Sequence, residues 1–494
     1  MFRLLLRWLP LAVLTLVAFW LRTHGLDRRP MHADEGNQAL KTAELLERGH
    51  YVFDPRDHHG PTLYYAGSLV ARLRGENTLA GLSEVSLRLI PALFGTAGVV
   101  LLAWCITASP RFPTSGLARW PALAAALFLA ASPPAVYFSR YFIQETLLAA
   151  LTLATFLGVR AWWQTGLTRW ALLAGICAGL MQATKASAPL FLALGLIAVL
   201  FTRDGARPAS LRPRRDGAFA LLAAAGTAAL LYSSFGTHPA GLRDALAVYG
   251  HAIARFGTES PPTGHEKSWW YYLRLFGWTR EGGLLWHQAA FSALALTGFV
   301  MAWVRRDPFT RGVAIYATLV TASFSAFPYK TPWHAVHFVP AYATLAAYAL
   351  ANLARLRTGR LLAISVALIT TATLLQQVWR CAILRPADWR NPYAYVHTSA
   401  DVRKFRPLAE QAAASRPGEP IRVISEEYWP LPWYLRGLAN VGFWTSPPDE
   451  TDGALVITSQ GQADAVRAKF RRPYRETFVG LRPGFVCVVF IPES

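Results

Sequence analysis

Charged residues are scarce in this chain. They make up 16% of its 494 residues, whereas a soluble protein of this length would contain about 25%. Hydrophobic residues make up 53%, and they form long continuous blocks rather than an amphipathic pattern. This distribution argues against a soluble globular protein and favours a polytopic α-helical membrane protein.

Cysteine is also rare, with four residues in the chain. Cys105 and Cys177 fall inside apolar blocks, where we expect them to serve packing. We expect Cys381 and Cys487 on the outer side of the membrane, where they could pair, and the sequence leaves open whether they do. The chain has no zinc-finger spacing.

Acidic residues are outnumbered, with 29 of them against 49 basic residues and a net charge of +20. Such a charge suggests nucleic acid as a partner. However, the arginines fall in the connections between apolar blocks, and no basic helix is interleaved with aromatic residues. We therefore attribute the charge to anionic lipid and to membrane topology, and expect no nucleic-acid partner.

The first apolar block, Trp8–Leu21, follows Arg3 and Arg7. No small-residue cleavage site comes after it, so we interpret it as an uncleaved first span rather than a signal peptide. Further blocks bring the expected number of membrane spans to about eleven. They lie near residues 5–23, 88–107, 119–137, 143–163, 170–184, 187–202, 217–235, 285–304, 312–328, 334–353 and 361–380.

Arginine placement orients these spans, because cytoplasmic loops carry the excess of basic residues. Arginine-rich segments occupy every second connection between the blocks, and a cytoplasmic N-terminus places all of them inside. The outer face of the cell membrane then receives the loops 24–87 and 236–284 and the tail after residue 381. The arginine-rich segments lie near residues 111–119, 169, 203–215, 305–311 and 355–360.

The chain divides into two expected domains. Residues 1–384 form the transmembrane domain, which carries both outer loops. Residues 385–494 lose the long apolar runs and gain short β-like runs, so we expect a small extracytoplasmic α/β domain there. Its expected helix covers residues 402–414, and its expected strands cover residues 421–425, 454–458 and 485–491.

The first outer loop carries an acidic pair, Asp34-Glu35, just beyond the first span. Adjacent carboxylates at a membrane surface can act as a general base, coordinate a metal or cap a helix. Asp34 stands where it could cap a helix that runs from about residue 35 to residue 48 and ends at Gly49. Both the catalytic and the capping interpretation remain open, and one residue can do both.

The same loop contains Asp57-His58-His59. Two histidines beside an aspartate could ligate a metal, but without a spaced third ligand, polar loop contacts are the favoured interpretation. The following residues, Thr62 to Leu73, predict an amphipathic helix at the membrane interface.

Four charged residues stand at the outer ends of spans, where an unneeded charge is costly. Arg140 could simply reach the membrane surface, and Glu145 could pair with Arg140 or serve a site. Lys185 and Lys330 lie outside against the positive-inside trend, and lysine suits phosphate. Outer carboxylates with outer cations suit a reaction on a lipid-linked phosphate.

These clusters resemble the GT-C superfamily of polyprenyl-phosphate-sugar-dependent glycosyltransferases, which includes the protein O-mannosyltransferases and the aminoarabinose transferases. The resemblance covers about the first 350 residues and departs from the usual pattern at Gly60, where proline is common, and at Trp333, where tyrosine is commoner. It rests on His32-Ala33-Asp34-Glu35, His59-Gly60-Pro61-Thr62-Leu63-Tyr64-Tyr65, Ser86-Leu87-Arg88-Leu89-Ile90-Pro91, Ser139-Arg140 with Glu145, Ala183-Thr184-Lys185, and Tyr329-Lys330-Thr331-Pro332-Trp333 with Pro340.

The resemblance implies an inverting transfer of a sugar from a polyprenyl-phosphate donor to a hydroxyl of a lipid, glycan or protein at the cell envelope. It assigns Asp34 as the general base, Glu35 as the residue that orients the base or the acceptor, and Glu145 as a second acid. The resemblance leaves a divalent metal possible and its ligands unknown. Donor-phosphate contacts would come from Arg140, Lys185 and Lys330, and substrate-loop contacts from His58, His59 and Tyr64.

Two other functions remain as alternatives, a lipid-linked-sugar flippase or transporter and a non-catalytic partner in glycan assembly. The absence of symmetric halves argues against the transporter, and the intact acidic pair argues against the non-catalytic partner.

Aromatic residues gather in the second outer loop, in Trp269-Trp270-Tyr271-Tyr272 and Trp278, and in the tail, from Tyr428 to Tyr434. An aromatic belt is the favoured interpretation for the loop, and packing against the membrane domain for the tail. Stacking on sugar rings is the alternative for both.

Overall fold

The computed structural model describes residues 2–56, 59–107, 120–201, 210–257 and 265–493. They group into two compact units. The helical unit comprises Met1–His24, His50–Ala66 and Arg88–Leu384, and the sheet unit comprises Gly25–Gly49, Gly67–Leu87 and Arg385–Ser494. Residues 25–49 and 67–87, which we expected in the transmembrane domain, cluster here with the C-terminal residues.

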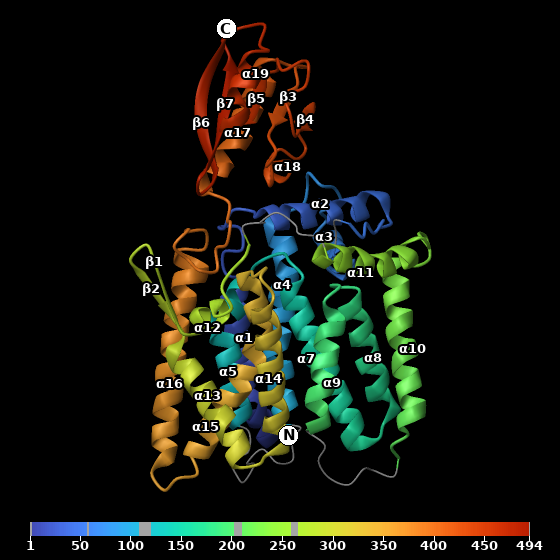
Figure 1. Ribbon diagram of the computed structural model, residues 1–494, viewed down its shortest axis with the longest axis vertical. Helices are drawn as coiled ribbons and strands as arrows, with labels where there is room; N and C mark the ends of the chain where they lie inside the picture. Colours follow the sequence, from blue (N-terminus) through green and yellow to red (C-terminus); the bar gives the residue numbers. More distant parts are fainter. Residues whose placement is uncertain (1, 57–58, 108–119, 202–209, 258–264, 494) are drawn as a thin grey trace. The chain divides into compact units, whose positions relative to one another are not determined.

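Each expected span overlaps a helix of the helical unit. Apolar blocks favour helix because a helix satisfies its backbone hydrogen bonds within the segment, as lipid surroundings demand. In Figure 1 the long helices run roughly side by side, and α11 (Gly241–Gly257) crosses the end of α10. The helices are α1 (Phe2–Thr23), α4 (Glu84–Thr107), α5 (Trp120–Ala131), α6 (Pro133–Phe138), α7 (Glu145–Thr165), α8 (Thr168–Gln182), α9 (Ala188–Phe201), α10 (Pro213–Tyr232), α13 (Ala289–Val304), α14 (Pro308–Ala326), α15 (Val339–Leu353) and α16 (Gly359–Val378).

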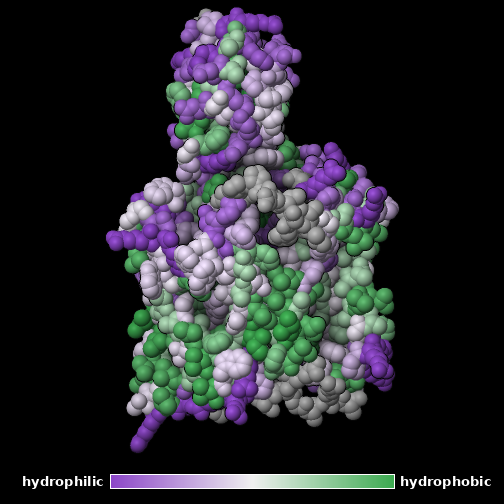
Figure 2. Space-filling model, in the orientation of Figure 1, coloured by the Kyte–Doolittle hydropathy of each residue, from purple (hydrophilic) through white to green (hydrophobic). Residues whose placement is uncertain are grey.

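Three described helical segments are long and apolar enough to cross a membrane on their own: Glu84–Thr107, Glu145–Thr165 and Gly359–Leu384. Five shorter apolar helices of 10–17 residues accompany them. Figure 2 shows apolar side chains gathered on the surface of these helices, between hydrophilic ends. A helix-rich membrane protein is confirmed in this coarse sense, while the number of spans stays a prediction.

Small residues bring helices of this unit close together. On α8, Gly175 and Gly179 face α10, and a Cβ atom at these positions would stand 2.2 Å from the Ala220 carbonyl oxygen and 2.4 Å from that of Ala224. The two glycines form the G-x-x-x-G spacing that lets helices approach closely in membranes. The packing of α8 on α10 therefore depends on the absence of side chains at both positions.

Two details of the expected spans were decided by the structure. The break expected between residues 184 and 187 is present, because α8 ends at Gln182 and α9 begins at Ala188. The expected start of the span at residue 285 was wrong. Strands β1 (Trp278–Glu281) and β2 (Leu284–His287) form an antiparallel hairpin there, and the helix begins at Ala289.

The sheet unit contains a five-stranded sheet in the order β4-β3-β5-β7-β6 (Figure 1). Three strands are parallel: β3 (Ile421–Ile424), β4 (Val441–Trp444) and β5 (Leu455–Ser459). Strands β6 (Tyr474–Arg482) and β7 (Phe485–Pro492) are antiparallel to their neighbours. The predicted α/β character is confirmed, but the sequence missed β4, which is only four residues long, and β6, in which charged residues interrupt the apolar run.

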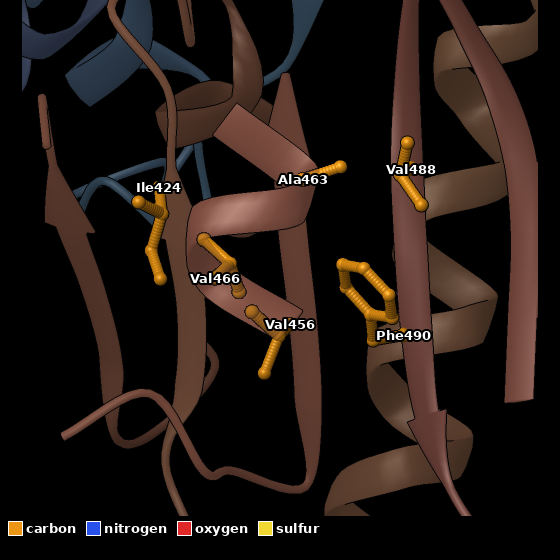
Figure 3. Close-up of a cluster of buried hydrophobic side chains, with 6 residues drawn as sticks. All are labelled: Ile424, Val456, Ala463, Val466, Val488 and Phe490. Atoms are coloured by element: carbon orange, nitrogen blue, oxygen red, sulfur yellow. The ribbon is translucent and has the colours of Figure 1, made fainter. Parts of the chain in front are cut away.

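Short helices complete this unit. Helix α17 (Phe405–Ser415) matches the expected helix, and α19 (Ala463–Arg467) packs over the sheet. Figure 3 shows buried side chains of α19 against strands β3, β5 and β7. This core makes the C-terminal residues a self-contained hydrophobic cluster. Its members are Ile424, Val456, Ala463, Val466, Val488 and Phe490.

Candidate active site

The acidic pair lies in the first turn of helix α2 (Ala33–Arg48), which belongs to the sheet unit. His32 is the N-cap residue, and its Nδ1 accepts a hydrogen bond from the backbone N–H of Asp34 at 3.0 Å. Glu35 returns the bond, because its Oε2 accepts from the backbone N–H of His32 at 3.2 Å. This reciprocal capping box fixes where the helix begins. The helix ends at Gly49, as predicted, in the left-handed conformation that glycine tolerates.

The two carboxylates of the pair have different surroundings. The side chain of Glu35 is fully buried, and its Oε1 accepts from Arg29 Nη2 at 3.2 Å. The side chain of Asp34 is 47% exposed, with its carboxylate 3.8 Å from His32 Nδ1. The expectation that Asp34 might cap the helix was wrong, because His32 and Glu35 share that task. The arrangement leaves Asp34 as the accessible carboxylate of the pair.

C-terminal residues of the same unit hold the start of α2 in place. The hydroxyl of Tyr434 accepts a hydrogen bond from the backbone N–H of Met31 at 2.8 Å. The imidazole of His397 lies edge-on to that of His32, with ring centroids 5.5 Å apart. The position of the acidic pair is thus set by residues about 360 to 400 positions later in the chain.

Helix α2 also has a close backbone contact with the C-terminal residues at Gly36. A Cβ atom at Gly36 would lie 3.2 Å from Pro430 Cβ and 3.4 Å from the ring of Trp429. A larger side chain would push this turn away from the aromatic ring. Gly36 therefore lets the first turn of α2 pack directly on the segment that follows β3.

In the helical unit, Glu145 and Lys185 form an ion pair. Glu145 begins α7, Lys185 follows the end of α8, and the ammonium of Lys185 donates to Glu145 Oε1. Both side chains are shielded, with 3% of Glu145 and 15% of Lys185 exposed. Of the two roles considered for Glu145, pairing is thus observed with Lys185 rather than with Arg140.

Arg140 and Lys330 are both buried and both contact backbone carbonyls. Arg140 donates to the carbonyl oxygens of Leu21 at 3.0 Å and His24 at 2.7 Å, which lie at the end of α1. A cation is favourable at a helix C-terminus because the carbonyl groups there are negatively polarised. Lys330 donates to the carbonyl oxygens of Lys267, at 3.0 Å, and of Phe327.

The segment that begins at His59 docks on the end of α8. The backbone N–H of Thr62 donates to the Ala183 carbonyl at 3.0 Å. A Cβ atom at Gly60 would stand 2.2 Å from that same oxygen, so a side chain there would need the backbone to move. Two motifs about 120 residues apart thus meet directly, and this places the His59 segment beside Lys185.

Two of the predicted substrate-loop residues have different surroundings. Tyr64 is fully buried, with its ring centroid 5.0 Å from that of Tyr51. His59 is half-buried and interacts electrostatically with His334. The third, His58, lies outside the described residues.

No role was predicted from the sequence for His334 or His337, and Tyr272 was expected only in an aromatic belt or as a residue that stacks on a sugar ring. His334 interacts electrostatically with Lys185, and the hydroxyl of Tyr272 lies 3.2 Å from His334 Nδ1 and donates to the Thr331 carbonyl. Both histidines belong to one 3₁₀ turn, Pro332–His337, in which residues three apart share a face. That spacing, directly after the Lys330 motif, was the available signal.

An apolar cavity of about 220 Å³ opens between α4, α7, α9, α14 and α15 of the helical unit. His337 lines one end of it and interacts electrostatically with Lys185. Arg160 and Gln164 also line the cavity, and most of the remaining wall is aliphatic or aromatic. The unit thus combines a polar cluster with an adjacent hydrophobic space.

Within the described ranges, no three His, Cys, Asp or Glu residues are grouped closely enough to hold a metal ion. We assign no metal ligand. Cys381 and Cys487 are both buried free thiols, as are Cys105 and Cys177.

A family model described as dolichyl-phosphate-mannose-protein mannosyltransferase matches residues 58–233. No curated protein matches the chain in sequence. Among solved structures, ArnT from Cupriavidus metallidurans bound to undecaprenyl phosphate is similar, with a TM-score of 0.63 and 17% identity over 97% of each chain.

Two solved structures from Archaeoglobus fulgidus are similar as well. The oligosaccharyltransferase of this organism in the apo form has a TM-score of 0.59 and 13% identity, over 98% of this chain and 76% of that one. Its oligosaccharyltransferase AglB, in complex with an inhibitory peptide and a dolichol-phosphate, has a TM-score of 0.54 and 13% identity over 92% and 70%. At these identities the likeness shows the fold. The fold implied by the resemblance to GT-C proteins is therefore confirmed.

Proposed function

We propose that the chain is an inverting glycosyltransferase of the cell membrane. It moves a sugar from a polyprenyl-phosphate donor to a hydroxyl acceptor on the extracytoplasmic face. Asp34 is the general base, and Arg140, Lys185 and Lys330 serve the donor phosphate. The proposal combines the chemistry of these side chains with the fold and with the family model that matches residues 58–233.

The reaction needs one base and one stabilised leaving group. The acceptor oxygen attacks the anomeric carbon while the bond from that carbon to the phosphate oxygen breaks. The acceptor proton passes to the carboxylate of Asp34, and the electron pair of the broken bond stays on the polyprenyl phosphate. Cations stabilise the negative charge that develops there. A single displacement from the opposite face inverts the configuration at the anomeric carbon.

The difference between Asp34 and Glu35 carries the proposal. A base must reach the proton that it removes, so it must be accessible to the acceptor. Asp34 meets this condition, with 47% of its side chain exposed. Glu35 is fully buried between Arg29 and the backbone of His32, and we propose that it positions the base by fixing the start of α2.

A polyprenyl phosphate is apolar along its chain and anionic at one end. The apolar cavity beside His337 suits an isoprenoid chain, and the neighbouring Lys185 suits the phosphate. The ion pair with Glu145 holds the ammonium of Lys185 in place before the donor arrives, which reduces the ordering needed on binding. Two of the similar structures contain a ligand of this class, one undecaprenyl phosphate and the other a dolichol-phosphate.

The test is Asp34→Asn in the full chain reconstituted into liposomes with a polyprenyl-phosphate sugar and an acceptor extract. Transfer should fall at least a thousandfold, while expression and thermal unfolding stay as in the wild type. Glu44→Gln is the matched control, because Glu44 is a partly exposed carboxylate on the same helix. Full transfer by Asp34→Asn would refute the catalytic assignment. Donor movement across the bilayer without sugar transfer by the wild type would favour the flippase instead.

A further inference from the structure

The carboxyl ends of the three parallel strands form a polar cluster in the sheet unit. The chain runs from β3 to β4 on one side and then crosses to β5 on the other side of β3. Strand order reverses at this point, and open α/β sheets bind ligands at the carboxyl ends of strands where such a reversal occurs. Figure 3 labels Ile424, the last residue of β3, and Ala463, the first residue of α19. The residues of the cluster lie between these two positions in the sequence.

Glu426 is the centre of this cluster. It follows β3 by two residues and is exposed. Its Oε2 accepts from the Ser459 hydroxyl at 3.1 Å, and its Oε1 accepts from the side-chain amide of Gln462. The same amide donates to the carbonyl oxygen of Thr445 at 2.8 Å, which follows β4. One carboxylate, one hydroxyl and one amide thus join the ends of all three parallel strands.

Aromatic residues follow Glu426 closely in the chain. Tyr428 lies two residues after Glu426, with its ring centroid 5.3 Å from that of Phe443 and 6.1 Å from that of Trp429. All three rings are partly exposed. Two later aromatic residues of the segment differ, because Trp433 is buried and donates to Glu84 Oε1 at 2.9 Å, and Tyr434 is bonded to Met31. The segment therefore separates into packing residues and an accessible aromatic surface.

This combination suits a saccharide. A sugar ring has an apolar C–H face that packs on an aromatic ring, and hydroxyl groups at its edge that donate well to a carboxylate. Hydrogen bonds from its own backbone N–H, from Gln462 and from Ser459 hold the pKa of Glu426 below its usual value. The carboxylate is therefore an ionised acceptor at neutral pH.

The aromatic surface is connected to the proposed catalytic base. Trp429 packs on Gly36, two residues after Asp34 in the first turn of α2. We infer that the surface formed by Glu426, Tyr428, Trp429 and Phe443 binds a saccharide unit of the acceptor. Trp429 contacts the same first turn of α2 that carries Asp34. This inference rests on the proposed function, and it narrows the acceptor to a glycan or glycolipid.

Binding can be tested without any transfer reaction. The full chain in lipid nanodiscs is titrated, in the absence of donor, with maltose, cellobiose, mannobiose and chitobiose at up to millimolar concentration. Tryptophan fluorescence and saturation-transfer NMR report the contact. We expect at least one disaccharide to bind, Tyr428→Ala and Glu426→Gln each to weaken its binding about tenfold, and Asp34→Asn to leave it unchanged.

The control is Phe478→Ala, because Phe478 is a 62% exposed aromatic residue on β6, the edge strand farthest from β4. This variant should bind as the wild type does. Failure of all four disaccharides to bind, or equal binding by Tyr428→Ala and the wild type, overturns the inference. Since Asp34→Asn abolishes transfer only if the proposed function holds, the two experiments fail independently of one another.

Discussion

Lys185 donates a hydrogen bond to Glu145 from 40 positions later in the chain. Each residue stands at the end of a different helix, and the pair is shielded from solvent. Removing one member of such a pair leaves the other charge buried without this partner, which costs about 3–5 kcal/mol. The pair therefore couples the ends of α7 and α8, and in the proposed function Lys185 also serves the donor phosphate.

Substitutions of this pair should separate the two tasks. We expect Lys185→Ala to raise the KM for the donor at least tenfold, because the phosphate loses a cation, and Glu145→Gln to raise it less. A double-mutant cycle on donor KM should give a coupling of about 1–3 kcal/mol. Strict additivity of the two substitutions would show that Glu145 does not position Lys185.

The two carboxylates of the acidic pair should differ in their effect on stability. Glu35→Ala removes the capping box and the partner of Arg29, so we expect the free energy of unfolding to fall by about 3 kcal/mol. Asp34→Asn changes an exposed side chain and should stay within about 0.5 kcal/mol of the wild type. Thermal unfolding of the purified variants measures both. Equal destabilisation by the two substitutions would contradict the division of roles.

Acidification should loosen the start of α2. Burial lowers the pKa of His32 and holds the pKa of His397 well below its usual value, despite the nearby carboxylates of Asp34 and Glu35. The guanidinium of Arg29 also disfavours protonation of both imidazoles. Protonation of His32 at Nδ1 would also remove the acceptor of the hydrogen bond from the backbone N–H of Asp34, which caps helix α2.

The sign follows from proton binding. Below the ordinary histidine pKa of about 6.5, the unfolded chain binds protons that the folded chain does not. Stability is therefore present above about pH 6.5 and falls as the pH drops below it, by up to about 1.4 kcal/mol per pH unit for each histidine. His397→Gln should reduce this pH dependence in thermal unfolding between about pH 7.5 and pH 5. An unchanged slope would exclude His397 as a contributor.

The glycines of α8 offer a test of helix packing. Gly179→Ala would bring a Cβ atom to 2.4 Å from the Ala224 carbonyl oxygen, so we expect a loss of about 1–3 kcal/mol. Gly226→Ala on α10 is the matched control, because nothing lies within 4 Å of its added Cβ atom. The control should be neutral or stabilise by about 0.5–1 kcal/mol. Unfolding in detergent measures both, and equal stability of the two variants would contradict this packing.

The apolar cavity predicts a dependence on donor chain length. Ala341 lines the cavity, so Ala341→Phe should reduce use of long polyprenyl donors while use of a two-isoprene donor stays near that of the wild type. Ala293→Phe, at an exposed position on α13, is the control and should affect neither donor. The test is kcat/KM of Ala341→Phe for both donors. An equal loss of kcat/KM with the long and the short donor would show that the isoprenoid chain binds elsewhere.

Local sequence pattern determined much of this molecule. Long apolar blocks predicted the helices of the helical unit, since a segment in lipid satisfies its hydrogen bonds internally. Turn chemistry at Gly49 predicted the end of α2, and α3 (Thr62–Leu73) coincides with the amphipathic helix expected there. The motifs around Asp34, Arg140, Lys185 and Lys330 pointed to the GT-C resemblance, and the fold that this resemblance implies is the one observed.

Tertiary structure decided what each of these residues contacts. The sequence shows that Asp34 and Glu35 are adjacent, but only the fold shows that Glu35 is buried against Arg29 while Asp34 is 47% exposed. Likewise, the sequence could not tell that Glu145 pairs with Lys185. Helix and strand periodicity depends on neighbours a few residues apart, whereas an ion pair or a buried cap depends on distant segments brought together by packing. For this reason the sequence predicted a pair of candidate carboxylates, and the fold determined which of the two is exposed.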